Sequence, residues 1–434
     1  MMSKRAVAAL ILSLALGAAV FPGGASGQLP SPSTAALGTA NNYTALARGF
    51  TAIALNPAGL GMPGNPGFSL TFLPVQAQAG LNAISLADIA AFNGMKIPVA
   101  TKEEWLRSVT DEGALTAQAG LAVTEMALSA GPIGLQISSV VQMDASLSPD
   151  AVELALFGNA GRTGTVRDMN LAGTSANGWA VTTVAVAFGM GLPAPASQGG
   201  SLAVGATLKY TVGDGVLAAR DDGSVITANP IGIDLALPSI APDSFPDSFN
   251  ANSGSGVGLD LGVAWEGLTW TLTAAIQNLF HTFQWDLEGF AYRPGTVLLK
   301  ADTTATDFDA VPAANAPGAL RNEVLEQSFG TALNLGAAYR RSDRLVLTAD
   351  LRIDGGDTLV QRVGSHIGVG AELRLLPFLP LRSGFSRVSG GAVHLAAGLG
   401  LELGPVHFSA AYLTEKNSAR EFRAASFVLS FGHN

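Results

Sequence analysis

The feature that most constrains the fold is a period-two alternation of apolar and small or polar side chains. In residues 393–402, Leu395 and Leu399 share the apolar parity, whereas His394 and Glu402 occupy the other. The same alternation recurs in residues 257–265, 333–340 and 366–375. Successive side chains of a β-strand point to opposite faces, so each stretch has one apolar and one small or polar face. Stretches of about ten residues with this pattern are typical of transmembrane barrels, whereas soluble strands usually have about five or six residues.

The predicted fold class is therefore all-β, an antiparallel transmembrane β-barrel. Tight turns are expected at residues 265–267, 341–343 and 403–405, and longer polar connections at 215–254, 290–327 and 354–364. Short turns at one end and long loops at the other are typical of such barrels. With both chain ends on the turn side the strand number is even, and we predict about 14 strands.

The composition excludes several classes of protein. With 48% hydrophobic and 13% charged residues, the 434-residue chain is too apolar for a disordered protein. Beyond the N-terminus it has no apolar run of about 18 residues, so helical membrane spans are not expected. The net charge of −9 and the lack of a Lys/Arg run argue against a nucleic-acid partner. Without Cys, the chain has neither disulfides nor thiolate metal ligands.

The N-terminus has the order of a secretory signal. Lys4 and Arg5 precede a mostly apolar run over residues 6–20, and small residues at 25–27 offer a cleavage site. The run is shorter than the roughly 20 residues of a typical membrane span. We predict residues 1–27 as a signal peptide for Sec export.

Short helices are expected in the connection after the first strand, near residues 82–112. Thr101 and Glu104 form a capping-box pattern that predicts a helix through Val109. Residues 85–92 are a second helical candidate, and residues 149–158 are a weaker one.

Several short motifs resemble those of a known family. Residues 47–49 and 56–60 together look like the N-terminal pattern of FadL-type outer-membrane proteins and of the related PorV-like barrels. Further similar motifs are found at residues 258–262, 277–279, 369–372, 381–385 and 398–401. The resemblance implies a monomeric barrel of fourteen strands with an N-terminal hatch in the lumen. It also implies either passive uptake of long-chain fatty acids and other hydrophobic compounds, or, for PorV-like members, a role in protein secretion.

The residues themselves favour such a hatch. A barrel of about fourteen strands is too wide to be filled by its own wall side chains. Irregular backbone at membrane depth requires surrounding protein or a water-filled cavity, and Pro and Gly give residues 54–66 a compact irregular path. We predict a hatch over residues 28–66 and a barrel over residues 67–434. The alternative is an ordinary periplasmic turn before the first strand. The predicted hatch motif is Asn56, Pro57, Ala58, Gly59 and Leu60.

Charged residues gather late in the chain on the parity assigned to the lumen. An Arg or Lys facing lipid at mid-depth costs about 2–4 kcal/mol, which is why this parity is placed inward. Mixed signs at alternating positions predict cross-strand ion pairs; the alternative is a polar collar around a permeation route or a seat for the hatch. These candidate lumen charges are Arg340, Arg344, Asp350, Arg352, Glu372, Arg374 and Glu402.

Apolar residues around the hatch motif are candidates for lining a hydrophobic ligand pocket. The alternative is that they pack the hatch against the wall. The candidate lining residues are Phe50, Leu55, Met62, Phe68 and Phe72, together with Leu60 of the motif.

We predict an outer-membrane channel or binding protein, in a Gram-negative-type bacterium, for passive uptake of hydrophobic small molecules such as long-chain fatty acids. The alternative is a PorV-like barrel that serves protein secretion, or a structural or interaction protein. The expected partners are outer-membrane lipid, a fatty-acid-like molecule and the barrel-assembly machinery. The chain has no Gly-x-Ser-x-Gly elbow, His-Glu-x-x-His helix or Walker loop, so no enzymatic activity, cofactor or metal is expected.

Overall fold

The computed structural model describes residues 29–193, 200–243, 253–300, 302–355, 365–389, 392–416 and 420–433. For residues 420–433 it describes the backbone course. The predicted signal peptide lies outside the described residues.

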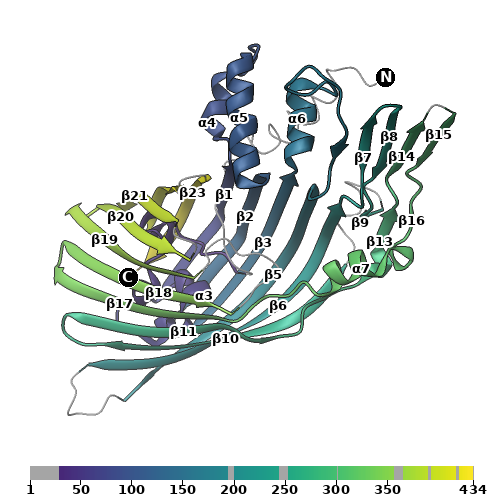
Figure 1. Ribbon diagram of the computed structural model, residues 1–434. Helices are drawn as coiled ribbons and strands as arrows, with labels where there is room; N and C mark the ends of the chain where they lie inside the picture. Colours follow the sequence, from purple (N-terminus) through teal and green to yellow (C-terminus); the bar gives the residue numbers. More distant parts are fainter. Residues whose placement is uncertain are drawn as a thin grey trace.

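Within the described residues, fourteen long strands form a ring in which each strand pairs antiparallel with the next (Figure 1). The last strand pairs back onto the first, from Phe68↔His433 to Phe72↔Leu429 and again at Asn82↔Arg420. The ring comprises β1 (Phe68–Asn82), β2 (Leu115–Ala130), β3 (Ile133–Leu147), β5 (Ser175–Leu192), β6 (Ser201–Arg220), β10 (Gly254–Glu266), β11 (Trp270–His281), β17 (Ala332–Ser342), β18 (Leu345–Asp354), β19 (His366–Leu376), β20 (Leu379–Val388), β21 (Val393–Leu403), β22 (Val406–Lys416) and β23 (Arg420–His433). The predicted antiparallel β-barrel is confirmed.

The alternation places apolar side chains on the outside of the ring. On β21, Leu395 and Leu399 are about half exposed, at 50% and 49%, whereas His394, of the opposite parity, is 3% exposed. The same contrast holds on β19, where Ile367 and Val369 face outward. The outer face is therefore apolar, and the inner face carries small, polar and charged residues.

The two ends of the ring differ as predicted. At one end, here called the turn side, tight turns join β10 to β11, β17 to β18, β19 to β20 and β21 to β22. At the other end, the loop side, β1 connects to β2 through α4 (Leu86–Ala91) and α5 (Val99–Glu112), and β3 connects to β5 through α6 (Pro149–Phe157). Among the described residues, none of the helices is both long and apolar enough to traverse a membrane.

The capping prediction at Thr101 is wrong. Helix α5 begins at Val99 and follows Pro98, which makes no side-chain cap. Proline fixes its own φ, so the chain already enters the helical course before Thr101 is reached. The capping box in this connection belongs instead to Ser85 and Asp88, at the start of α4.

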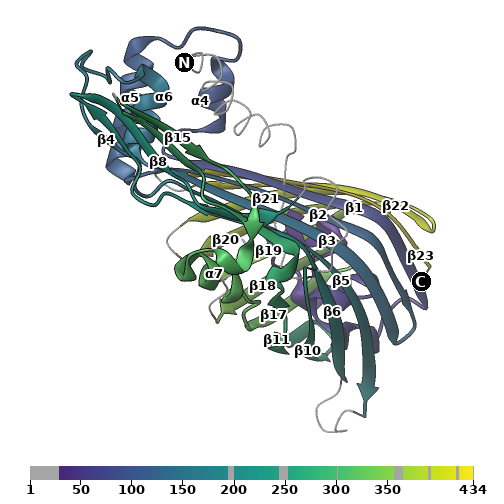
Figure 2. The same cartoon turned by 90° about the vertical axis from the view of Figure 1, so that its right-hand side faces the viewer.

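The loop side carries more regular structure than its polar sequence indicates. A separate five-stranded sheet is ordered β15 (Thr303–Asp307), β14 (Thr296–Lys300), β8 (Ile231–Ala236), β7 (Val225–Ala228) and β4 (Met169–Asn170). Four short strands extend the sheet of the ring: β9 (Ser239–Pro242), β12 (Gln284–Trp285), β13 (Phe290–Arg293) and β16 (Val311–Pro312). The same connections contain η3 (Leu287–Gly289), η4 (Ala313–Asn315) and α7 (Gly318–Leu325). Figure 2 shows this sheet and the loop helices projecting beyond the ring.

Candidate functional site: the filled lumen

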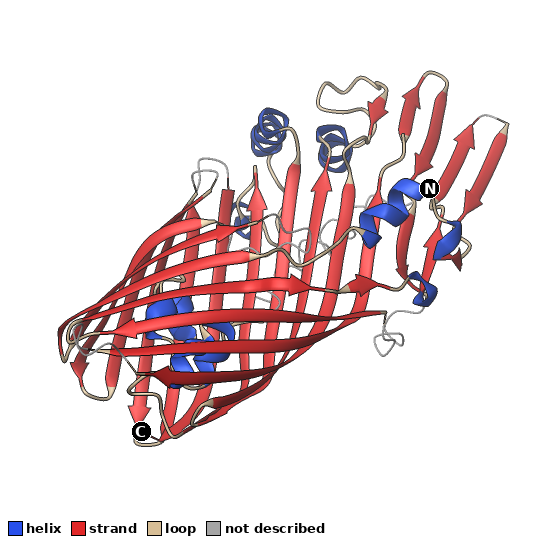
Figure 3. Ribbon diagram, turned by 90° about the horizontal axis from the view of Figure 1, so that it is seen from below, coloured by secondary structure: helices blue, strands red, loops and turns tan. Residues whose placement is uncertain are grey.

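The N-terminal segment, residues 29–66, lies inside the ring on the turn side, where Figure 3 shows helices enclosed by strands. It contains α2 (Thr34–Gly38), η1 (Thr44–Leu46), α3 (Phe50–Leu55) and η2 (Pro57–Gly61). Helix α2 contacts β20–β23, η1 contacts β11 and β17, α3 contacts β1, β2, β3 and β5, and η2 contacts β5, β6 and β10. We call this segment the hatch. Because its contacts reach strands all around the ring, it spans the lumen.

The motif at residues 56–60 is bound to the wall at Asn56 and, just before the motif, at Ala54. The Asn56 side chain is 1% exposed; its Oδ1 accepts from the Ala58 N–H at 3.1 Å, and its Nδ2 donates to the Val263 carbonyl of β10 at 3.2 Å. Gln277 of β11 donates from Nε2 to the Ala54 carbonyl at 2.7 Å. The motif is therefore a buried junction between hatch and wall.

Three paired glycines of the wall form the seat of Pro57. Gly189, Gly205 and Gly262 stand opposite one another across β5, β6 and β10. A Cβ at Gly205 would lie 2.3 Å from the Pro57 carbonyl carbon, and one at Gly262 would lie 2.0 Å from Asn56 Oδ1. The small residues of the inward parity therefore allow the hatch backbone to approach the sheet closely.

A second buried asparagine, Asn42, anchors the part of the hatch between α2 and η1. It is fully buried; its Nδ2 donates to the Thr39 carbonyl at 2.7 Å, and its own carbonyl accepts from Thr348 Oγ1 at 2.6 Å. Nearby, the Thr44 N–H donates to Asp350 Oδ2 at 2.9 Å. Asn42 was missed from the sequence, because it stands outside the Pro/Gly-rich stretch that marks the motif.

The predicted apolar lining does not form one pocket. Phe50, Leu55 and Leu60 pack in one cluster with Ile53, and Met62 belongs to another with Ala58. The predictions for Phe68 and Phe72 are wrong: these side chains are 46% and 47% exposed on the outer face of the ring. Strand β1 begins at Phe68, and its pairing with β2 and β23 points this parity outward.

The candidate charges fall into separate groups. Near the turn side, Glu372 pairs with Arg382 at 2.8 Å and with Arg374 at 3.1 Å, and Arg374 pairs with Glu402 at 2.7 Å. Closer to the loop side, Arg352 Nη1 donates to Gln277 Oε1 at 2.8 Å. Of the other three, Asp350 accepts from the Thr44 N–H of the hatch, and Arg340 and Arg344 are exposed at the turn-side rim.

On the loop side of the hatch, Lys209, Asp260 and Asn278 form a group of buried polar side chains, here called the polar layer. Lys209 is 2% exposed, and its Nζ lies 2.5 Å from Asp260 Oδ1 and 2.5 Å from Asn278 Oδ1. The Asn278 N–H donates to the same Asp260 oxygen at 2.7 Å. This triad was missed, although Lys209 shares the inward parity of Thr207 and offered a signal.

The loop-side half of the lumen is filled by apolar side chains. Phe329 and Phe283, from the connection between β11 and β17, pack edge-to-face with centroids 5.4 Å apart, and Phe329 also meets Trp179 of β5 at 6.3 Å. Trp285 joins them and donates from Nε1 to Gln327 Oε1 at 3.0 Å. A cavity of about 370 Å³ lies between Trp179 and α7. We call this cluster, around Trp179, Phe283, Trp285 and Phe329, the apolar layer.

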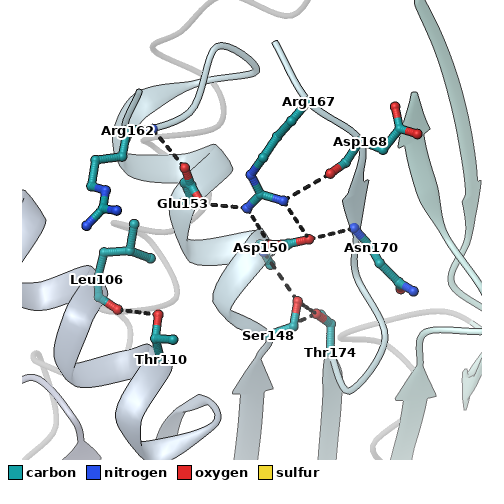
Figure 4. A network of polar contacts seen from close by, with 11 residues as sticks. Leu106, Thr110, Ser148, Asp150, Glu153, Arg162, Arg167, Asp168, Asn170 and Thr174 are labelled. Atoms are coloured by element: carbon teal, nitrogen blue, oxygen red, sulfur yellow. Dashed lines mark hydrogen bonds and ion pairs between the residues drawn. The ribbon is translucent and has the colours of Figure 1, made fainter. Parts of the chain in front are cut away.

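Outside the ring, an ion-pair network holds the loop after α6 (Figure 4). Arg167 Nη2 lies 2.6 Å from Asp150 Oδ1 and 2.6 Å from Glu153 Oε2. Burial raises the pKa of Asp150, but its hydrogen bonds with Arg167 and the Asn170 N–H outweigh burial and lower that pKa below its ordinary value. Burial also raises the pKa of Glu153, but its hydrogen bonds with the Arg162 N–H and with Arg167 outweigh burial. The pKa of Glu153 therefore also lies below its ordinary value.

Within the described part of the chain, no group of His, Asp or Glu side chains is arranged to hold a metal ion.

A protein-family model matches the central part of the chain. The family model described as "F plasmid transfer operon, TraF, protein" matches residues 99–351. No curated protein sequence matches the chain.

Solved structures share the architecture at low sequence identity. A deltaS2 mutant of the monoaromatic hydrocarbon channel TodX is 12% identical with a TM-score of 0.51, over 92% of this chain and 99% of that one. A Pseudomonas aeruginosa FadL homologue gives 13% and 0.48, over 94% and 99%. The Ralstonia pickettii toluene transporter TbuX gives 12% and 0.47, over 93% and 98%. The TodX match supports a FadL-like barrel fold.

Proposed function

This chain belongs to the family of F plasmid transfer operon TraF proteins, and we propose that it is an outer-membrane barrel for the passive passage of hydrophobic small molecules. In this proposal a molecule enters from the loop side and partitions into the apolar layer. It then passes the polar layer when the hatch is displaced, and leaves at the turn side. Fatty-acid-like molecules are the substrate class we propose; neither an enzymatic step nor a cofactor has a part in it.

The observation that carries the proposal is the apolar layer at the loop-side entrance. A water-filled porin has a polar interior, whereas here Trp179, Phe283 and Phe329 are buried in the lumen. Ligand pockets for small molecules are lined mainly by hydrophobic and aromatic side chains with a few polar groups. The cavity beside Trp179 does not fit that description, because Asp144, Glu323 and Glu326 line it together with the amides of Asn177 and Gln327. The proposal therefore rests on the apolar layer itself and not on this cavity.

The hatch supports a gated rather than an open passage. It is joined to the wall by individual side-chain bonds, such as those of Asn56 and Gln277, and is covalently continuous with the ring only at β1. Each such bond contributes about 0.5–1.5 kcal/mol, so part of the hatch can leave its seat without unfolding the ring.

The outer face of the ring supports the membrane location. Apolar side chains such as Ile367, Leu395 and Phe408 are about half exposed on it, which is favourable against lipid. We propose that the chain is exported by its N-terminal signal and inserted by the barrel-assembly machinery. One chain supplies every strand of the ring, which supports a monomer.

Uptake into proteoliposomes tests the proposal. Wild-type protein should admit a fluorescent fatty acid faster than protein-free vesicles do, and Trp179→Ala should slow this entry. Tyr412→Ala, on the outer face of β22, is the control and should leave the rate unchanged. Equal rates with and without wild-type protein would overturn the proposal.

One observation favours a second role in protein assembly or secretion. Within the described residues, β15 pairs with β14 on one side only, and all five of its residues are exposed. An unpaired strand edge is a template for pairing with another chain, and the family description names a transfer operon. If this role holds, deleting residues 296–307 abolishes retention of a protein partner and leaves fatty-acid uptake intact.

A further inference from the structure

A second cavity, of about 530 Å³, lies on the turn-side face of the hatch. Hatch residues such as Tyr43, Arg48 and Phe50 form one wall, and the rim residues Arg340 and Arg344 form part of the other. This cavity is separated from the apolar layer by the hatch itself. We call it the rim pocket.

Most charges around the rim pocket are already paired. Arg48 Nη2 lies 2.8 Å from Glu266 Oε2, Arg374 pairs with Glu402 at 2.7 Å, and Glu372 is shared by Arg374 and Arg382. These pairs leave little charge for a ligand.

Two guanidinium groups of the rim pocket differ from the rest. Within the described part of the chain, the side chains of Arg340 and Arg344 have neither an ion pair nor a hydrogen bond with protein, and both line the pocket. The carboxylate of Asp343 also lines it, so these three residues leave a local excess of one positive charge. An Arg guanidinium presents a planar fork of donors that matches carboxylate and phosphate oxygens.

Apolar residues complete the rim pocket. Leu46, Phe50 and Val346 line it alongside the two arginines. Its volume lies within the range of about 300–1,000 Å³ found for small-molecule pockets. The combination of free guanidinium groups and apolar walls fits a molecule that has an oxyanion at one end and a compact apolar body.

We propose that the rim pocket binds an amphipathic organic anion, with Arg340 and Arg344 holding its carboxylate or phosphate head and Leu46, Phe50 and Val346 contacting its apolar body. A ligand can reach this pocket from the turn side without crossing the ring. The site therefore goes beyond the proposed passage of molecules, and binding can be tested apart from uptake.

Calorimetric titration of the full-length protein in a nonionic detergent tests the site with octanoate, octyl phosphate and octanol. Octanoate and octyl phosphate should bind saturably, and octanol should not. The double variant Arg340→Ala, Arg344→Ala should weaken octanoate binding about tenfold or more, the factor expected for loss of a charge-assisted hydrogen bond. Arg341→Ala removes the same charge from the same turn but not from the pocket lining, so it should bind as wild type does.

Three results would overturn the site: no saturable binding of either anion, octanol binding as tightly as octanoate, or equal weakening by Arg341→Ala and by the double variant. Heat-modifiable migration on a gel shows that each variant has kept its barrel. Nanodiscs separate two sources of the same head-group chemistry. If phosphatidylglycerol competes with octanoate, the pocket takes a lipid head group; if it does not, the pocket takes a soluble anion.

Discussion

The two halves of the lumen are filled in different ways. On the turn side, the hatch brings its backbone against wall glycines such as Gly205 and is bound by polar groups such as Asn56. On the loop side, the apolar layer is packed by aromatic side chains of a connection between two wall strands, with Phe329 fully buried. The first half combines small wall residues, directed hydrogen bonds and small apolar clusters, whereas the second depends mainly on large buried aromatic side chains.

This difference bears on which half can move. Bonds to single carbonyl groups can be replaced by water one at a time, and the hatch is attached to the ring by one chain connection. The connection that carries Phe283 and Phe329 is attached to the ring at both ends, to β11 and to β17. We therefore expect the hatch to be the more readily displaced of the two fillings.

The largest expected effect comes from breaking the apolar layer. Phe329→Ala removes a fully buried ring that meets Trp179, His281 and Phe283, and should lower the free energy of unfolding by about 3–5 kcal/mol. Urea unfolding followed by tryptophan fluorescence measures it. Phe385→Ala, on the outer face, is the control and should cost less in detergent. Equal losses in the two variants would show that the apolar layer is not a packed core.

A smaller loss is expected from obstructing the hatch seat. Gly205→Ala places a methyl group 2.3 Å from the Pro57 backbone, and overpacking of this kind costs about 1–3 kcal/mol. The hatch should shift, so trypsin should cleave after Arg48 faster than in wild type. Gly67→Ala is the matched control, because its new Cβ meets nothing within 4 Å. Unchanged cleavage in Gly205→Ala would contradict the close seat.

A loss of about 1 kcal/mol is expected from Asn56→Ala. The change removes the helix-capping bond to the Ala58 N–H and leaves the Val263 carbonyl without this donor. Hydrogen exchange of residues 54–62 should rise, while exchange around Phe329 should not. Asn93→Ala, at an exposed position in the connection after α4, should change neither. A rise in both halves after Asn56→Ala would mean that they open together.

The sequence predicts the two halves unequally well. Period-two alternation is a local property, so it identified the strands, and Pro57 and Gly59 marked the irregular segment that fills the turn side. The outward direction of Phe68 and Phe72 depends on pairing with β2 and β23, and β23 lies more than 340 residues away. The apolar layer likewise joins Trp179 to Phe329 across a long connection. Such partners are set by ring closure and packing, which alternation in one stretch does not encode.

The smallest expected effect is that acid loosens the loop after α6 but not the hatch. Asp150 and Glu153 have a lower pKa in the folded protein than in the unfolded chain, so the unfolded chain binds more protons as the pH falls. The stabilisation that these two carboxylates give the folded protein is complete above their ordinary pKa values of 3.8 and 4.5. It is lost as the pH falls through their lower pKa values in the folded protein. Partly exposed pairs of this kind contribute about 0–1 kcal/mol.

Hydrogen exchange of residues 158–168, corrected for its intrinsic pH dependence, should therefore rise between pH 7 and pH 3. The double variant Asp150→Asn, Glu153→Gln lacks the titrating groups, so it should show high exchange at both values. The Asn56 contacts contain no titrating group, and exchange at residues 54–60 should stay constant in wild type. A rise there of the same size would mean that acid loosens the whole ring and not the α6 network.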